Sequence, residues 1–463
     1  MYKNLYLPIE IKKRELLPKF FLGLNALKKG FNVVIGDKIA ISHAIKFFGP
    51  GIYFYKSMNF NDTAHIKRIK NKNNIYVVHD EESGATHASK NILKQFLNIR
   101  SSNENVQLID RFYTWGKFDN SQWIKKYKKQ KNKFILTGSP RIDLCNKRIY
   151  KKFLKSEITD TKKKFNKFIL FISSGISSDT ELVNIFKQDK FFFKYKNLKE
   201  KQDRKKQMQN LRLYFKNSAK MIQNLSNKFK DINFVVRPHP NENINDWKKI
   251  FKRFKDNVFL DTSDSDITSM IIASKCVIHN SSFAGIQSTL LKKPLIVYKP
   301  KKISIPKRNF PNKLGNIAKS ENDVFVLLSK ILNSKKNVIK KNKINLLKTR
   351  LFIDKNCSAS SKIIDDLSKF KINSKKTNLI KLQLYSKYLF LKKFLKNKTN
   401  YETKNNTKTI YTRRSMRDKL GTGIEKKQML KYLENAKKSY PSLKNIFLKE
   451  FGPNGFYIYK KLI

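Results

Sequence analysis

The stretch KFILFISS, residues 167–174, decides the fold, because a new series of strands and helices starts with it in the middle of the chain. Toward the C-terminus, NFVVRP (233–238), CVIHN (276–280) and PLIVY (294–298) repeat this kind of short apolar run, with segments of helical spacing between them. Runs that are apolar on both faces and alternate with helices are typical of a parallel sheet covered on both sides. We therefore predict a doubly wound α/β domain over residues 165–340.

The chain before this stretch shows the same alternation, which predicts a first Rossmann-like domain over residues 1–150. Residues 345–463 are rich in Lys and lack the alternation, so we expect a helical extension there. The predicted fold class is α/β, with two tandem Rossmann-like, doubly wound domains and a C-terminal helical extension. The strands expected in the first domain are Asn4–Glu10, Asn32–Asp37, Gly51–Ser57, Asn74–Glu81, Arg111–Trp115 and Lys133–Gly138.

The net charge of +65 would suit a nucleic acid or an anionic membrane. The basic residues are 85 Lys and only 15 Arg, whereas base readout and paired phosphate contacts favour Arg. The excess is also spread along the chain, whereas a nucleic-acid footprint is clustered. We predict a solvated basic surface and no nucleic-acid partner. The alternative to an enzyme is a basic protein that binds nucleic acid or an anionic membrane and has no catalytic activity.

Several familiar motifs are missing from the chain. Cys145, Cys276 and Cys357 lie far apart, which argues against a disulfide framework and a Cys-built zinc site and favours a reducing compartment. The sequence has no run of 18 apolar residues, no apolar signal-peptide core, no Gly-rich dinucleotide fingerprint, no Walker loop and no His or acid pair with metal spacing. We expect a cytoplasmic protein that uses no cofactor and no metal ion.

Polar residues follow the predicted strands of the second domain, where parallel sheets bind their ligands. Arg237 offers paired donors to a phosphate, and His239 can move a proton. Small hydroxyl residues ahead of a helix leave backbone N–H groups for an anion. The predicted donor-binding residues are Arg237, His279, Ser281, Ser282, Gly285, Gln287, Ser173 and Ser174, with His239 as a catalytic candidate.

In the first domain, Asp80, Glu81 and Glu82 lie at the end of a predicted strand as three consecutive acids, which repel one another unless cations or a function retain them. A carboxylate in this position can take a proton from an acceptor hydroxyl, so all three are catalytic candidates. A solvated loop paired with lysines is the equally weighted alternative. Glu10, Arg141 and Asp143 are expected on the acceptor side or at the hinge, with Arg141 paired to Asp143.

Taken together, these motifs resemble the surface-carbohydrate biosynthesis proteins related to GT-B glycosyltransferases and to CDP-glycerol glycerophosphotransferases. The resemblance covers residues 1–300 and leaves out the tail. Its strings are LYLPIEIKKREL (5–16), KKGFNVVIGDK (28–38), VVHDEESG (77–84), ILTGSPRIDL (135–144), VVRPHP (235–240) and HNSSFAGIQSTLLKKPLIVY (279–298).

The resemblance implies transfer of a sugar or polyol phosphate from a nucleotide-activated donor to a glycan or lipid-linked acceptor. It places the donor phosphates against Arg237, His239, Ser281 and Ser282. In such families a Glu commonly holds the donor ribose at the position of Gln287, so ribose binding is expected to be weaker here. A sugar-nucleotide 2-epimerase of the same fold is the alternative enzyme, and the basic tail suggests an anionic membrane surface as a further partner.

Overall fold

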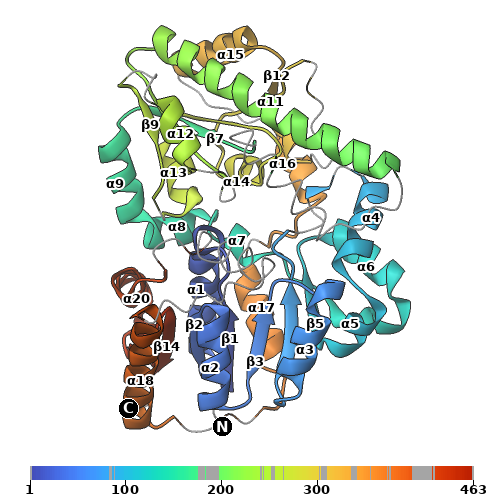
Figure 1. Ribbon diagram of the computed structural model, residues 1–463, viewed down its shortest axis with the longest axis vertical. Helices are drawn as coiled ribbons and strands as arrows, with labels where there is room; N and C mark the ends of the chain where they lie inside the picture. Colours follow the sequence, from blue (N-terminus) through green and yellow to red (C-terminus); the bar gives the residue numbers. More distant parts are fainter. Residues whose placement is uncertain are drawn as a thin grey trace. The chain divides into compact units, whose positions relative to one another are not determined.

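The structure is a computed structural model (Figure 1), in which the chain forms two compact units. The first unit contains residues 1–85, 89–153 and 348–463, and the second contains residues 86–88 and 154–347. The described residues are 3–82, 86–87, 89–175, 183, 198–239, 242, 244–251, 256–263, 265–301, 303, 310–334, 341–354, 356–372, 374, 377–398, 420 and 423–460.

The first unit is built on an eight-stranded sheet with the order β13-β14-β2-β1-β3-β4-β5-β6. Strands β1 to β6 are parallel, and β13 and β14 are added in antiparallel fashion at the β2 edge. The strands of this sheet are β1 (Lys3–Pro8), β2 (Phe31–Gly36), β3 (Ile52–Tyr55), β4 (Ile75–His79), β5 (Arg111–Thr114), β6 (Phe134–Leu136), β13 (Ile446–Glu450) and β14 (Gly455–Lys460).

Helices cover this sheet because each presents an apolar stripe to it. In α1, for example, Leu16, Leu17 and Phe20 are buried, and α2 starts where Asp37 accepts a hydrogen bond from the Ala40 N–H. The helices of the unit are α1 (Lys12–Lys28), α2 (Lys38–Phe48), α3 (Thr63–Lys70), α4 (Lys90–Arg100), α5 (Asn103–Leu108), α6 (Lys117–Lys126), α7 (Pro140–Asp143), α8 (Lys147–Phe153), α17 (Ala359–Leu367), α18 (Leu379–Lys398) and α20 (Lys426–Ser439).

The C-terminal segment is helical, as expected, but it also supplies a β-hairpin that the sequence analysis did not predict. Strand β14 pairs with β2, with Phe456 opposite Ile35 and Ile458 opposite Val33. Phe456 and Ile458 are buried, and Tyr457 stacks on Phe48 of α2 with ring centroids 4.7 Å apart. The segment therefore completes the first unit instead of forming a third one.

The second unit has a parallel six-stranded sheet with the order β12-β11-β10-β7-β8-β9. Its strands are β7 (Phe168–Ile172), β8 (Asn233–Arg237), β9 (Val258–Leu260), β10 (Cys276–His279), β11 (Leu295–Tyr298) and β12 (Asn316–Ala318). Its helices are α9 (Lys155–Phe165), α11 (Leu198–Lys228), α12 (Ile244–Phe251), α13 (Ile267–Ala273), α14 (Ala284–Leu290), α15 (Glu321–Asn333) and α16 (Lys341–Lys348), the last of which ends in the first unit.

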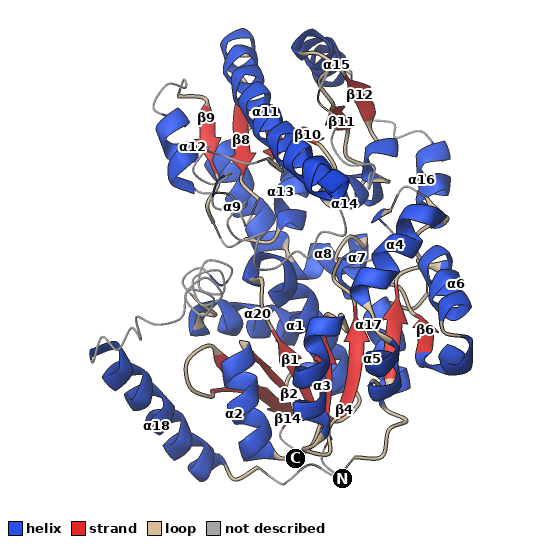
Figure 2. Cartoon of the chain, turned by 45° about the vertical axis from the view of Figure 1, so that its right-hand side comes forward, coloured by secondary structure: helices blue, strands red, loops and turns tan. Residues whose placement is uncertain are grey.

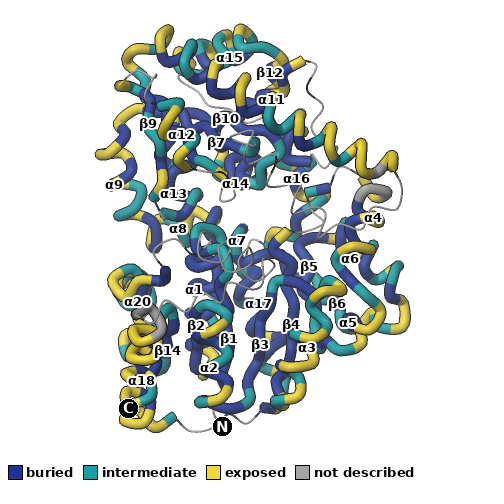
Figure 3. Tube along the Cα trace, viewed as in Figure 1, coloured by how far each residue is buried: buried dark blue, intermediate teal, exposed yellow. Residues whose placement is uncertain are grey.

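Both sheets confirm the predicted fold class. Helices lie on the two faces of each sheet (Figure 2), and the central strands are buried, whereas the edge strands β12 and β13 are partly exposed (Figure 3). Each sheet has a point where the strand order reverses, between β1 and β3 in the first unit and between β7 and β10 in the second. Ligands of such sheets bind beyond the carboxyl ends of the strands beside this point. Among the described residues, no helix is long and apolar enough to cross a membrane.

Asp143 joins α7 to the C-terminal segment, and its expected pairing with Arg141 is not the contact that the structure shows. Its carboxylate accepts hydrogen bonds from the Ala359 N–H (2.8 Å), the Ser360 N–H (2.8 Å) and the Ser360 hydroxyl (2.6 Å). These groups form the first turn of α17, where backbone N–H groups lack partners within the helix. Asp143 is thus a helix anchor in the first unit.

We predict that Asp143→Asn lowers the free energy of unfolding by about 1–3 kcal/mol, because the amide would turn an N–H toward a buried donor. The matched control is Asp365→Asn on the same helix, where the half-exposed carboxylate pairs with Lys29 and its loss should cost less than about 1 kcal/mol. Urea unfolding of both variants measures the difference. Equal losses in the two variants would contradict the anchor role.

Candidate functional site

The first group of candidate residues lies at the reversal point of the first sheet. Glu10 follows β1 and Lys56 follows β3, and their side chains form an ion pair of 2.8 Å across this point. Lys38, at the start of α2, contacts the other oxygen of Glu10 at 3.2 Å. Burial alone would raise the pKa of Glu10, but Lys56 and Lys38 outweigh it and lower the pKa to about 2. Glu10 is therefore a charged structural residue and a poor proton acceptor at neutral pH.

Glu15 and Lys19 form a buried ion pair close to Glu10. Glu15 is fully buried and accepts from the Lys19 ammonium (3.1 Å) and from the Arg14 guanidinium (3.1 Å). Lys19, which is 2% exposed, also donates to the Pro8 carbonyl at 2.6 Å, so the pair ties α1 to the end of β1. Burial would raise the pKa of Glu15, but Lys19 and Arg14 hold it well below its usual range. We did not expect this group from the sequence, although Glu15 and Lys19 lie among buried apolar positions.

The three consecutive acids have three different environments. Asp80 is buried and makes a two-point contact with Arg100, with distances of 3.0 and 2.7 Å. Its backbone carbonyl also accepts from the indole of Trp115 at 2.8 Å. Glu82 has a side chain that is 57% exposed and lies 3.6 Å from Arg100. Asp80 therefore has a structural partner, and Glu82 is the solvated member.

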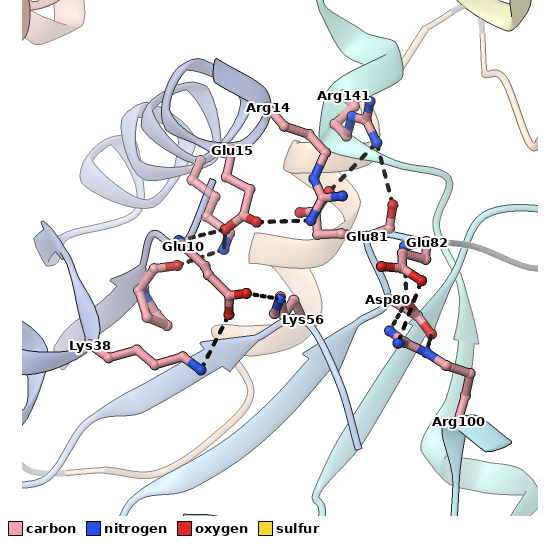
Figure 4. A network of polar contacts seen from close by, with 12 residues as sticks. Glu10, Arg14, Glu15, Lys38, Lys56, Asp80, Glu81, Glu82, Arg100 and Arg141 are labelled. Carbon is pink, nitrogen blue, oxygen red and sulfur yellow. Dashed lines mark hydrogen bonds and ion pairs between the residues drawn. The ribbon is translucent and has the colours of Figure 1, made fainter. Parts of the chain in front are cut away.

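Glu81 differs from its two neighbours, because it is buried and one of its carboxylate oxygens has no hydrogen-bond partner. That oxygen, Oε2, lies 4.0 Å from Nη1 of Arg141, which donates instead to the Glu81 carbonyl at 3.3 Å. Figure 4 shows the Arg14 guanidinium between Glu15 and Glu81. Burial raises the pKa of Glu81, and the cations Lys19, Arg141 and Arg14 only partly offset this. Of the three acids, Glu81 is the one suited to accept a proton.

In the second unit, a carboxylate that the sequence analysis missed organises the strand ends. Glu242 is buried and accepts four hydrogen bonds from three segments. They come from the Ser173 hydroxyl (2.7 Å), the Gly175 N–H (2.8 Å), the His239 N–H (3.2 Å) and the Trp247 indole (2.9 Å). Burial raises the pKa of Glu242 to about 7, although the four donors act against it. The loops after β7 and β8 are thus held to α12 by one side chain.

Arg237 ends β8 at the expected place, but its guanidinium already has partners within the unit. It forms a buried ion pair with Asp261 (2.5 Å) and donates to the Ser265 carbonyl (2.6 Å). Both partners lie just beyond β9, so Arg237 binds neighbouring strand ends together. His239, two residues further along, is exposed. Pro240, like Ser83 and Gly84 of the acidic motif, lies outside the described residues.

The residues at the end of β10 and after it, 279–285, contact one another closely. The buried imidazole of His279 accepts from the Ser282 N–H at 3.2 Å, and burial lowers its pKa to about 3, so it is neutral. A Cβ on Gly285 would lie 2.6 Å from Cε1 of His279, which shows that this glycine makes room for the histidine and not for a ligand. Ser281 has a φ of 58°, and its N–H donates to Asn312 at 2.7 Å.

Three hydroxyl residues at this edge are partly exposed: Ser281, whose hydroxyl donates to the Asn280 side chain at 2.8 Å, Ser174 and Ser282. Ser174 is partly exposed and donates to the Asn280 carbonyl at 2.9 Å across the reversal point between β7 and β10. Ser282 is also partly exposed, and its hydroxyl accepts from the Ala284 N–H at 3.3 Å, which leaves its own proton for an acceptor. Gln287, by contrast, is 3% exposed and donates to the Thr268 hydroxyl at 3.1 Å. In this structure Gln287 links α14 to α13.

Among the described residues, no group of three or more His, Cys, Asp or Glu side chains is placed to hold a metal ion. The charged groups at the strand ends are instead carboxylates paired with Arg and Lys. Such pairs fix side-chain positions and tune proton affinities. The arrangement can therefore support proton transfer in the first unit.

Comparison with known proteins supports the fold. No protein-family model and no curated protein matches the chain. Among solved structures, the wall teichoic acid polymerase TagF is 13% identical, with a TM-score of 0.50 over 79% of this chain and 88% of that chain. MnaA of S. aureus, solved with UDP, is 12% identical, with a TM-score of 0.46 over 79% and 96% of the two chains. At this level of identity, the likeness to TagF concerns the GT-B-like fold alone.

We predict that Glu242→Gln destabilises the second unit by about 1–3 kcal/mol for each donor that loses its acceptor. A Gln amide has one acceptor oxygen, so its NH2 group would face two of the four donors. The matched control is Glu321→Gln, because Glu321 is partly exposed and accepts one hydrogen bond from the Asn224 side chain at 2.8 Å. Thermal unfolding compares the two, and an unchanged melting temperature for Glu242→Gln would contradict the organising role.

Proposed function

We propose that this chain transfers a sugar or polyol phosphate from a nucleotide-activated donor to a glycan or lipid-linked acceptor, in the biosynthesis of surface polysaccharide or lipopolysaccharide. The observation that carries the proposal is Glu81, a buried carboxylate with a raised pKa and an unpartnered oxygen at the carboxyl edge of a parallel sheet. The GT-B-like fold and the motif resemblance support the same reaction class. The proposed place of action is the cytoplasm.

Glu81 is the proposed general base. A carboxylate with a raised pKa is a stronger proton acceptor than one with an ordinary pKa. The acceptor hydroxyl would donate to Oε2, the oxygen without a hydrogen-bond partner. Because this oxygen is shielded from solvent, the Arg141 guanidinium, 4.0 Å away, has to move when the acceptor binds.

The donor phosphates are proposed to bind at the carboxyl edge of the second sheet. Ser174 and Ser282 supply hydroxyl groups there, and His239 supplies an exposed imidazole that can donate to the leaving phosphate. Arg237, Ser173, His279, Gly285 and Gln287 act in this proposal as positioning residues, since each is buried in contacts within the unit. The proposed mechanism uses no resident metal ion, and the hydroxyl groups of Ser174 and Ser282 together with the His239 imidazole are proposed to stabilise the departing charge.

The experiment compares Glu81→Gln with Glu82→Gln, a control in the adjacent residue that is largely exposed. A screen of CMP-, CDP-, UDP- and GDP-activated donors by thermal shift first identifies the donor, since a bound ligand stabilises the folded state. We expect Glu81→Gln to lower the transfer rate by about 10²–10⁴-fold and Glu82→Gln to change it less than about threefold. In the wild type, the rate should fall as pH drops through the raised pKa of Glu81, above the ordinary 4.5.

Three results would contradict the proposal. Equal rates in wild type and Glu81→Gln would remove Glu81 from the chemistry. Conversion of a sugar nucleotide in the absence of any acceptor would identify a 2-epimerase and contradict the transferase. Binding to nucleic acid that weakens steeply with salt, without turnover of any donor, would favour the binding-protein alternative.

A further inference from the structure

Helix α18 (Leu379–Lys398) has two apolar sides, and the described residues of the first unit cover one of them. On the covered side, Leu382 and Leu389 are 1% and 7% exposed and belong to the aromatic core beside α2. Tyr385 lies between them and stacks on Phe47 with ring centroids 5.4 Å apart. Through these three side chains, α18 packs on the hydrophobic core of the first unit.

The other side carries a second apolar stripe. Ile380, Leu384, Tyr388, Leu391 and Leu395 are 52–73% exposed, and their spacings of four, four, three and four residues place them in one row along the helix. With about 100° per residue, Leu391 lies roughly opposite Leu382. Figure 3 colours most of this helix as exposed. Large apolar side chains gathered in one exposed row mark an interaction surface.

The charges on the helix indicate what this surface binds. Residues 379–398 contain six Lys and no acidic residue. Lys381 and Lys392 lie at one border of the stripe and Lys387 at the other, and all three are exposed. Lysines that flank an apolar row can place their ammonium groups at a polar surface while their stems lie along the apolar one. A second copy of the chain, with a net charge of +65, would be repelled.

We propose that the outer row of α18, formed by Ile380, Leu384, Tyr388, Leu391 and Leu395, binds the surface of an anionic lipid bilayer. The row inserts among the acyl chains at the interface, and the flanking lysines contact anionic headgroups. In this proposal the helix lies in the plane of the interface and does not cross the membrane. This inference stands on α18 alone and is independent of the proposed transfer reaction.

The experiment is sedimentation of the full chain with sucrose-loaded vesicles of phosphatidylcholine alone or mixed equally with phosphatidylglycerol. The test variant carries Leu384→Gln, Leu391→Gln and Leu395→Gln. The matched control carries Ile39→Gln, Phe60→Gln and Ile99→Gln, three residues of the same unit with 55–66% exposure outside α18. We expect the wild type and the control to bind the anionic vesicles and the test variant to bind at least tenfold more weakly.

A second variant tests the charge. Replacing Lys381, Lys387 and Lys392 by Gln should reduce binding to anionic vesicles, and added salt should reduce wild-type binding as well. Equal melting temperatures of all variants show that the changes act on the surface and not on folding. Absence of wild-type binding, an equal loss in the Ile39, Phe60 and Ile99 control, or a dimer in light scattering that only the α18 variant dissociates would each overturn the proposal.

Discussion

The buried ion pair of Glu15 and Lys19 is the interaction on which the site in the first unit depends. It holds the start of α1 to the Pro8 carbonyl at the end of β1, and it positions Arg14 beside Glu81. Removing one member of such a pair leaves a buried charge and typically costs about 3–5 kcal/mol. The pair therefore fixes both the geometry and the electrostatic surroundings in which Glu81 titrates.

Each unit has a buried carboxylate at the carboxyl edge of its sheet, but the two carboxylates differ in their hydrogen bonds. Glu81 and Glu242 are buried carboxylates at the carboxyl edges of their sheets, and burial raises the pKa of both. The Glu242 carboxylate accepts a hydrogen bond from each of its four donors, and it thereby fixes the loops that carry Ser173 and His239. Glu81 keeps one oxygen without a hydrogen bond, and for this reason we propose a chemical role for Glu81 and an architectural role for Glu242.

The fold was predictable because doubly apolar runs and helical spacing are local signals. The pairing of β14 with β2 was not, since the partners lie at opposite ends of the chain, although Pro453, Asn454 and Gly455 are typical hairpin-turn residues. The prediction also placed the acidic motif and Arg237 at strand ends correctly. The sequence did not reveal that Asp80 pairs with Arg100 and Arg237 with Asp261, because each partner belongs to another element and comes close only in the folded unit.

For the same reason, the three acids could not be ranked from sequence. Asp80, Glu81 and Glu82 are neighbours with similar intrinsic proton affinities, and burial together with Arg100 separates them into a paired, an unpaired and a solvated carboxylate. For Gly285, the sequence indicated a functional position but did not show which atoms lie beside it. Gly285 was expected to bind the donor, but the space that its missing side chain leaves is filled by His279.

The most direct test of this account is the pKa of the Glu81 carboxyl group itself. It can be measured by a ¹³C NMR pH titration of the glutamate-labelled chain, with the signal assigned by its absence in Glu81→Gln. The account predicts a midpoint above the ordinary value of 4.5, because burial outweighs the neighbouring cations. A midpoint at or below 4.5 would show that Lys19, Arg14 and Arg141 hold Glu81 as a permanently charged structural residue, and would contradict its role as the base.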